Sequence, residues 1–373
     1  STVTYAYNTF KGGMLATNAS PSGQWFSLRT PDRDLSEYGP HAQWLELLRD
    51  RILRRMAATT YYSVLGDMIG DAGGLGNGAM MIEEDLENTF HARSIPLGSY
   101  WIGKGRRGEV THFASHRRIT VWQGIEEFAP MMGNGEPDLS NFSEPSQRAY
   151  KDNKSTEVSM DIIQFIYPNP KWRPQNPMSK RFISCHVEQA VEAGGWSGAD
   201  KDKILKESGF NIFPVKVFQW GCRDGDTWGL ACPGMDAFGD VKQVHVGERR
   251  ELQAIEKGLN PPLVGPPEIA SMRLKLGPGE YNGVEEGVGR GLRSIYDVQF
   301  RIAEHAAKQE QVRSRIKNAY HVPLFRLFEG LDDSRDRTAT EVAARQAEKM
   351  ILLSPNSQNL QQGAQGPSVE SIF

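Results

Sequence analysis

Apolar residues recur at helical spacing over residues 35–68. In "QWLELLRDRILRRM" they fall on one face, and most of the arginines fall on the other. The pattern predicts a helix there, and we expect the glycine-rich residues 70–78 to end it. The face consists of Trp44, Leu47, Leu48, Ile52, Leu53 and Met56.

The following residues alternate with the shorter period of strands. "AMMIEED" predicts a strand, and "GSYWIGKGRRGEVTHFAS" predicts a hairpin that turns at residues 103–108. "ITVWQGIEEFAP" predicts a short helix, and the polar residues 131–155 predict a loop. Three more strands are expected in "EVSMDIIQFIYP", "RFISCHVE" and "FPVKVFQW". The pattern favours an α+β fold with a mostly antiparallel sheet and flanking helices.

The pattern changes again after residue 235. Residues 236–258 and 293–320 have helical periodicity, and the segment between them, 259–292, is rich in proline and glycine. We expect a helical hairpin with a compact, non-helical insertion at its tip. The second helix carries only a thin apolar stripe, interrupted by Gln309, which suits packing against neighbouring helices. The stripe is Ile295, Val298, Ile302, Ala306, Gln309, Val312 and Ile316.

A dense run of charges, "DDSRDR", lies directly before a sharply defined helix start. Thr338 and Glu341 fit a capping box, in which each side chain accepts from the other residue's backbone amide. Such a cap stabilises a helix by about 0.5–2 kcal/mol. The helix is expected to run to about Leu353, and the polar residues 356–373 are expected to be disordered or poorly packed.

Composition narrows the class of protein. The net charge is −3 and mean hydropathy is −0.51, so a strong non-specific DNA grip is not expected. We find no apolar run near the length of a membrane span, and the N-terminal residues do not read as a signal peptide. The three cysteines have no C-x-x-C spacing, which favours synthesis in a reducing cytoplasm without a disulfide framework or zinc site.

Motifs for catalysis are also missing from the sequence. Residues 70–78 lack the Lys-Ser/Thr of a phosphate-binding loop, and "GGWSGA" has Ala199 where a nucleophile elbow has glycine. The eight histidines show no metal-binding spacing, and Asp332, Asp333 and Asp336 lack the spacing of a calcium loop. We therefore expect no cofactor, no metal and no enzymatic activity.

Several segments, taken in order, resemble the head-to-tail connector, or portal, proteins of short-tailed bacteriophages. The segment most similar to the family is "RDRTATEVAARQAEKM". Further similar segments are "SPSGQWFSL", "GAMMIEED", "ESGFNIFPVKVFQW", "WGLACPGMDAFGDVKQVH" and "NPPLVGPP". The resemblance covers nearly the whole chain, and it is the order of the segments that makes it specific.

The resemblance implies a portal fold with a defined division of the chain. Residues 1–235 would form an α+β wing, 236–258 and 293–320 the two stem helices, and 259–292 the clip. Residues 321–355 would return to the wing through a tunnel loop (327–337) and a tunnel-side helix, and a crown is not evident in 356–373. The loop residues implied to line the DNA channel are Asp332, Asp333, Ser334, Arg335, Asp336 and Arg337, with Thr338 and Glu341 as the helix cap.

The resemblance also implies an assembly and partners. Portal subunits form a ring, expected here to hold twelve copies, at one capsid vertex in the virion, after assembly in the host cytoplasm. Double-stranded DNA would pass through the ring, which would contact major capsid and scaffolding proteins, terminase, and tail adaptor or nozzle proteins, but no membrane. The clip prolines expected to dock terminase and adaptor are Pro261, Pro262, Pro266 and Pro267, and the stem residues expected between subunits are Val298, Ile302, Val312 and Ile316.

Two alternatives remain open. Another ring-forming virion protein, such as a tail adaptor, would usually be shorter, mainly helical and without the proline-rich insertion. A nucleic-acid-processing enzyme would need paired carboxylates or a phosphate loop.

Overall fold

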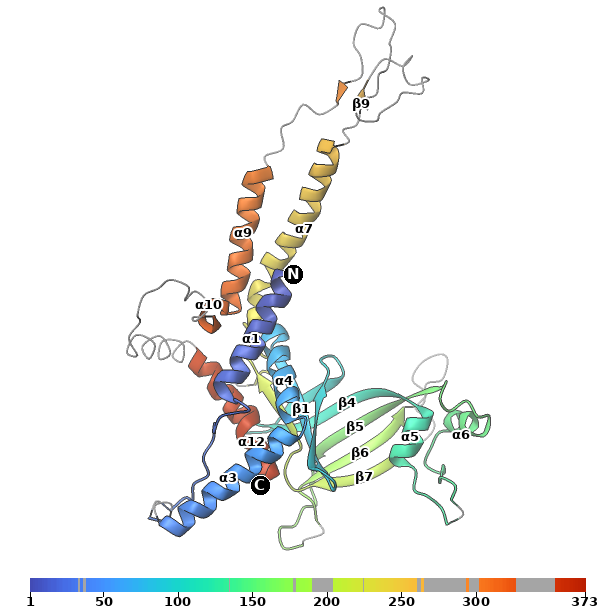
Figure 1. Ribbon diagram of the computed structural model, residues 1–373. Coiled ribbons are helices and arrows are strands. Elements are labelled where there is room, and N and C mark those ends of the chain that lie inside the picture. Colours follow the sequence, from blue (N-terminus) through green and yellow to red (C-terminus); the bar gives the residue numbers. More distant parts are fainter. Residues whose placement is uncertain are drawn as a thin grey trace, which may run out of the picture.

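Figure 1 shows the computed structural model of the chain, an α+β body from which a pair of long helices stands out. The structure describes residues 1–32, 34–35, 38–133, 135–176, 179–189, 204–223, 225–259, 263–264, 293–294, 302–326 and 353–373. The predicted fold class, helices with antiparallel sheet, is confirmed. Among the described residues, none of the helices combines the length and hydropathy that a bilayer crossing needs.

The N-terminal helix α1 (Thr2–Asn18) packs on α4 (Tyr61–Leu75) through glycines. A side chain at Gly70 would meet Tyr7, and one at Gly73 would meet Phe10. The prediction that residues 70–78 end the helix is confirmed, although Gly70 and Gly73 themselves lie inside α4, where they let α1 approach closely. α4 ends at Gly76, whose φ of 98° is the left-handed conformation that glycine adopts without a Cβ clash.

The predicted helix over residues 35–68 is divided in two. α3 (Gly39–Ala58) ends before α4 begins, and it buries only one edge against the body, through Ile52 and Met56. Trp44 and Leu47 on the same helix remain 56% and 62% exposed. In Figure 1 the N-terminal half of α3 projects away from the body at the lower left.

The strands form two antiparallel sheets. Sheet A has the order β2-β1-β8, and sheet B has the order β3-β4-β5-β6-β7. The strands of sheet A are β1 (Asn77–Asp85), β2 (Thr89–Ile95) and β8 (Val215–Gln219). Those of sheet B are β3 (Tyr100–Lys104), β4 (Val110–Thr120), β5 (Ser159–Pro168), β6 (Phe182–Gln189) and β7 (Ile204–Phe210). The strands and the hairpin predicted from the sequence are confirmed, whereas β2 and β7 were not predicted.

Two short helices cover one end of sheet B (Figure 1). α5 (Val121–Phe128) was predicted, and it begins with a capping box between Thr120 and Gln123. α6 (Glu144–Lys151) lies inside residues 131–155, so the prediction of a loop there is wrong for this part. Both helices contribute to an apolar cluster with the inner face of sheet B, in which the buried members include Phe128, Phe142, Ala149, Met160, Ile162 and Leu205.

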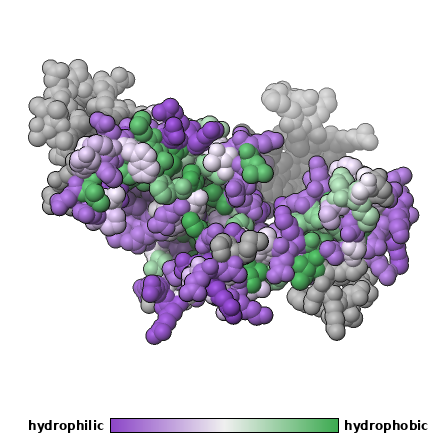
Figure 2. All heavy atoms as spheres, turned by 90° about the horizontal axis from the view of Figure 1, so that it is seen from below, coloured by the Kyte–Doolittle hydropathy of each residue, from purple (hydrophilic) through white to green (hydrophobic). Residues whose placement is uncertain are grey.

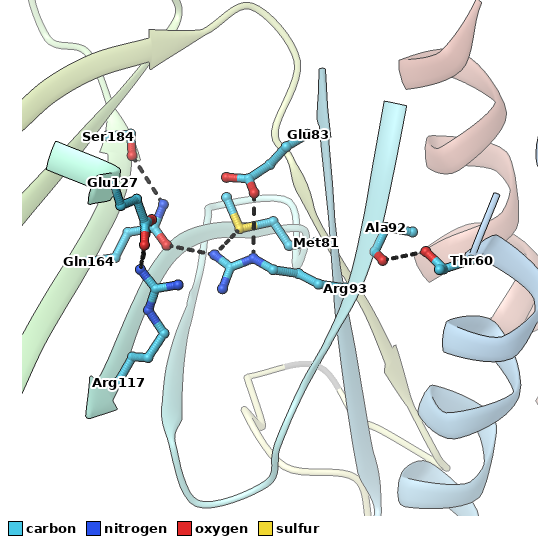
Figure 3. Close-up of polar contacts among 9 residues, drawn as sticks. All are labelled: Thr60, Met81, Glu83, Ala92, Arg93, Arg117, Glu127, Gln164 and Ser184. Carbon is cyan, nitrogen blue, oxygen red and sulfur yellow. Dashed lines mark hydrogen bonds and ion pairs between the residues drawn. The ribbon is translucent and has the colours of Figure 1, made fainter. Parts of the chain in front are cut away.

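Arg93 on β2 joins the two sheets (Figure 3). Its Nη2 donates to Oε1 of Gln164 on β5 at 3.1 Å, and its Nε lies 3.5 Å from Oε2 of Glu83 on β1. Gln164 in turn donates from Nε2 to Oγ of Ser184 on β6 at 3.2 Å. The shared arginine fixes sheet A and sheet B relative to one another, because its planar guanidinium bonds in defined directions.

Beyond β8 the chain forms the helical hairpin. α7 (Pro233–Leu259) and α9 (Ile302–Ala319) run side by side, and the short α10 (Val322–Phe325) follows. β9 (Leu263–Val264) pairs with β10 (Arg293–Ser294) at the far end. The hairpin was predicted correctly, but the second helix was not predicted correctly at its start, since residues 293–294 are strand.

The C-terminal residues are helical, which corrects the expectation of disorder for 356–373. Residues 353–360 are α-helical and continue into the π-helix η1 (Gln361–Gln365) and α12 (Gly366–Ile372). Leu360 and Ala364 are 0% exposed, and Gln365 donates from Nε2 to the backbone oxygen of Asn18 at 3.0 Å. The segment thus packs on α1 and closes the core although its composition is polar.

Candidate functional site: the α7–α9 hairpin

Ion pairs run along the contact between α7 and α9. Nη2 of Arg315 lies 2.9 Å from Oδ1 of Asp240, and Nη2 of Arg313 lies 3.0 Å from Oε1 of Glu248. Nδ1 of His305 lies 3.9 Å from Oε2 of Glu251. Exposed pairs contribute only about 0.2–1 kcal/mol each. Their effect here is on the register of the two helices, since each pair matches one position of α7 with one position of α9.

Gln309 occupies the middle of this contact. Its side chain is 6% exposed and lies against Gly247 on α7, where a Cβ would overlap the amide group. Within the described part of the chain, Oε1 of Gln309 finds no hydrogen-bond partner. A cavity of about 220 Å³ lies beside it, lined by Gln243, Val246, Gly247, Arg250, His305, Lys308, Gln309 and Val312. The residue that interrupts the apolar stripe therefore packs directly on a glycine of the other helix.

The base of the hairpin is embedded in the core of the body. Val312 and Ile316 on α9 are 3% and 0% exposed and belong to the same apolar cluster as Phe10. The Phe10 ring centroid lies 6.0 Å from that of Tyr320 and 5.5 Å from that of Trp220, both in edge-on geometry. This packing holds the hairpin rigidly at its base, because aromatic rings in contact resist sliding.

Burial also sets the titration of the residues at this base. Burial raises the pKa of Tyr320 and lowers the pKa of His321, with Asp236 acting against the second shift. His321 has a φ of 53°, a left-handed conformation that turns the chain from α9 into α10. Both side chains are thus held neutral at the turn, as their apolar surroundings require.

The outward side of α7 carries apolar residues that no described element covers. Phe238 is 58%, Val246 49% and Leu252 64% exposed. The ammonium of Lys242 lies 4.2 Å from the centroid of the Phe238 ring. Helical spacing in the sequence placed these residues on a helix but could not separate them from Val244, which is 9% exposed and belongs to the core cluster.

No group of three or more His, Cys, Asp or Glu side chains that could hold a metal occurs in the described ranges.

Comparison with known proteins decides the family. Residues 1–373 match the family described as bacteriophage head to tail connecting protein. The chain belongs to this family. It is 31% identical over 372 residues to the portal protein of Salmonella phage epsilon15, which covers 99% of the chain and 63% of that protein. It is 28% identical over 376 residues to the probable portal protein of Bordetella phage BPP-1, which covers 100% of the chain and 64% of that protein.

The family confirms the resemblance predicted from the sequence. The chain spans less than two thirds of the length of these two curated relatives, at 63% and 64%. What the relatives do as whole proteins is therefore taken up below as a proposal for this chain.

Most of the site residues predicted from the sequence lie outside the described residues. These are the tunnel loop with its cap (Asp332 to Thr338 and Glu341), the clip prolines (Pro261, Pro262, Pro266, Pro267) and Val298. Ile302 is the first residue of α9, but its side-chain surroundings are likewise outside the described part. Val312 and Ile316, which were predicted to lie between subunits, belong to one apolar cluster within the chain's own core.

Proposed function

We propose that the protein is a subunit of a phage portal, the ring at one capsid vertex through which double-stranded DNA is packaged, retained and ejected. The observation that carries the proposal is the family match over residues 1–373, together with a helical hairpin that stands out of an α+β body. A ring built from such subunits surrounds its axis with projecting helices. This arrangement suits a conduit.

Within this proposal, the segments of the chain have the roles that the resemblance implies. The body up to residue 235 is the wing, α7 and α9 are the stem, and residues 259–292 are the clip. Residues 327–337 are the tunnel loop. A crown is not assigned to residues 356–373, since Leu360 and Ala364 there are buried in the body.

Ring closure requires one surface of a subunit to meet a different surface of the next. Phe238 and Leu252 on α7 are exposed apolar side chains suited to such a stem contact. Val298 and Ile302 remain the proposed counterparts on the second stem helix. Val312 and Ile316 are already buried in one chain, so their substitution is expected to act on folding before it acts on assembly.

Passage of DNA is proposed to depend on the tunnel loop. A dense basic ring would hold a polyanion through many phosphate contacts. Mixing Asp332, Asp333 and Asp336 with Arg335 and Arg337 keeps the loop close to neutral. Replacing residues 332–337 with a Gly-Ser linker should impair DNA packaging or retention while rings remain intact, and normal packaging by that variant would contradict this role.

The proposed partners follow from the position of a portal in the particle. Terminase and then tail adaptor or nozzle proteins would dock at the clip, and major capsid and scaffolding proteins would surround the wing. The protein would be assembled in the host cytoplasm and reside at the head–tail junction of the virion. A tail adaptor is the second candidate, favoured only by the shared ability to form rings.

The test is negative-stain electron microscopy of the purified protein combined with native mass spectrometry. Rings with a central hole of about 20 Å or more, wide enough for a duplex with grooves of ~12 and ~6 Å, are the expected result. Rings without a hole of that width would contradict a DNA conduit. An ATPase and metal-dependence assay on the same sample checks the enzyme alternative, and we expect no activity.

A further inference from the structure

The two faces of sheet B are covered very differently. Along each strand, buried residues alternate with partly exposed ones, as expected when one face of a sheet packs on a core. The inner face is covered by α5 and α6 at one end and by sheet A at the other. Among the described residues, none of the three apolar clusters includes a side chain of the outer face.

This outer face nevertheless carries a group of apolar residues, beside the polar side chains of His116, Arg118 and Asp161. One row of directly opposed residues crosses all five strands, and it consists of Trp101, Ala114, Phe165, Cys185 and Glu207. The next row contains His116, Ile163, Val187 and Ile204. Trp101 is 61% and Phe165 41% exposed, and Tyr167 and Ile204 are 38% and 39% exposed. Exposed apolar residues gathered on one face in this way suggest an interaction surface.

Helix α3 also carries exposed apolar side chains, together with exposed arginines. Trp44 and Leu47 are exposed on a helix that touches the body only along its other edge. Arg51 and Arg54 follow at one helical repeat of seven residues and are exposed, and neither has an ion-pair partner among the described residues. The helix thus offers apolar side chains at one end of a stripe and unpaired positive charge at the other.

The spacing of the two surfaces is matched. From Trp44 to Arg51, and from Leu47 to Arg54, the rise along a helix is about 10 Å. From Phe165 on β5 to Glu207 on β7, two strand spacings also give about 10 Å. Glu207 is exposed and has no ion-pair partner among the described residues. A helix laid across the strands with its apolar end on Phe165 therefore brings an arginine to Glu207.

We propose that the outer face of sheet B receives helix α3 of a second copy of this chain, with Trp44 and Leu47 on Phe165 and Cys185 and with Arg51 or Arg54 paired to Glu207. Within one chain the contact is precluded, since the exposed half of α3 points away from sheet B on the other side of the body (Figure 1). The contact is head to tail, because each copy offers both surfaces and uses each toward a different neighbour. It rests on the proposed function, in which copies of the chain associate through different surfaces.

Viewed from below, the surface of the molecule is mostly hydrophilic, and its hydrophobic residues gather in separate groups (Figure 2). Separate apolar groups on one chain are what a head-to-tail contact needs, since the two surfaces that meet come from different places on the subunit.

The native Cys185 permits a direct test on the full chain. The variant Leu47→Cys, mixed from isotope-labelled and unlabelled protein and mildly oxidised, should form an intermolecular disulfide between positions 47 and 185, identified by peptide mass spectrometry. The matched control is Leu86→Cys, because Leu86 lies in the β1–β2 turn and is 96% exposed. The control should give no specific link to Cys185.

A charge exchange tests the same contact without relying on cysteine chemistry. Glu207→Arg and Arg51→Glu should each weaken association about two- to fivefold, as expected for an exposed ion pair, and the double variant should regain most of it. If Arg54 is the partner, Arg54→Glu shows the rescue instead. Leu47→Asp should weaken association at least about tenfold while the melting temperature of the monomer stays within a few degrees.

The outcomes separate this contact from the proposed function. Rings without the 47–185 link and without rescue overturn the contact and leave the portal proposal standing. The link and the rescue in an assembly that is not a ring support the contact and count against the portal proposal. Rescue by exchange together with the link in rings supports both, and a chain that stays monomeric at high concentration without the link overturns the contact.

Discussion

Gln309 on α9 is buried directly against Gly247 on α7, and the absence of a side chain at position 247 is what gives the glutamine its place. The two positions fix how closely the helices of the hairpin approach. Because the contact combines a glycine with an orphan amide oxygen, both its shape and its polarity can be tested.

Substitution of Gly247 is expected to destabilise the protein although alanine favours helices. Gly247→Ala introduces a Cβ that overlaps the amide at the end of the Gln309 side chain, so this amide must move toward the adjacent cavity. Overpacking typically costs about 1–3 kcal/mol, and we expect a net cost near the lower end of that range because the side chain is flexible. The matched control is Gly239→Ala on the same helix, where no atom lies within 4 Å of the added Cβ. The control should stabilise by up to about 1 kcal/mol through helix propensity.

Urea denaturation of both variants and of Gly247→Ala/Gln309→Ala makes the comparison. The double variant should recover part of the lost free energy of unfolding, since the overlap is removed. Equal stabilisation by Gly247→Ala and Gly239→Ala would show that the close approach does not exist in solution.

The ion pair between Asp240 and Arg315 is expected to contribute a small, salt-dependent amount. A double-mutant cycle with Asp240→Asn and Arg315→Gln should give a coupling free energy of about 0.2–1 kcal/mol at low salt. The coupling should shrink in 1 M salt, where the screening length falls to about 3 Å. No coupling at low salt would mean that the 2.9 Å contact is not populated in solution.

His186 is expected to make stability fall in mild acid. Burial against Phe128, whose ring centroid lies 5.1 Å away, lowers the pKa of His186 from 6.5 to about 4. The unfolded chain therefore binds more protons between these values, and the free energy of unfolding falls as pH drops through that window, by at most about 1.4 kcal/mol per unit.

Urea midpoints at pH 7 and pH 5 measure this effect. His186→Leu should lose less stability than the native protein over that interval, whereas His112→Leu, at an exposed position on β4, should retain the native pH dependence. A native-like loss in His186→Leu would assign the acid sensitivity to another group.

The C-terminal helical segment is expected to be essential to the core. Leu360 is 0% exposed, so Leu360→Asp buries a carboxylate without a partner and should cost about 3 kcal/mol or more. Phe373→Asp is the control, because Phe373 is 71% exposed and its replacement should change stability by less than about 0.5 kcal/mol. Thermal melts of the two variants distinguish a packed segment from a loosely attached one.

Local signals were sufficient for much of the fold. The hairpin around residues 103–108 follows from its glycines, and α5 was predicted within "ITVWQGIEEFAP". The two long helices follow from their periodicity and from the Pro/Gly-rich segment between them. The family was recognised through the order of several short segments, which needs no knowledge of their contacts.

Other features depended on contacts between distant residues. By local sequence alone, Gly70 and Gly73 predict a helix break. In the structure they lie inside a helix, where the lack of a side chain leaves room for Tyr7 and Phe10 to pack against them. The polar composition of the C-terminal residues predicts disorder, but Leu360 and Ala364 pack into an apolar core whose other members come from distant segments.

The sequence by itself determined many of the helices and strands and the family to which the chain belongs, because capping, periodicity and turn chemistry act between near neighbours. Only the tertiary structure decided which apolar residues are buried. Val312 and Ile316 share the spacing of an interface stripe but lie inside the chain, whereas Trp101 and Phe165 lie outside it. Periodicity gives a residue's face on its own element, and burial depends on what packs onto that face from elsewhere.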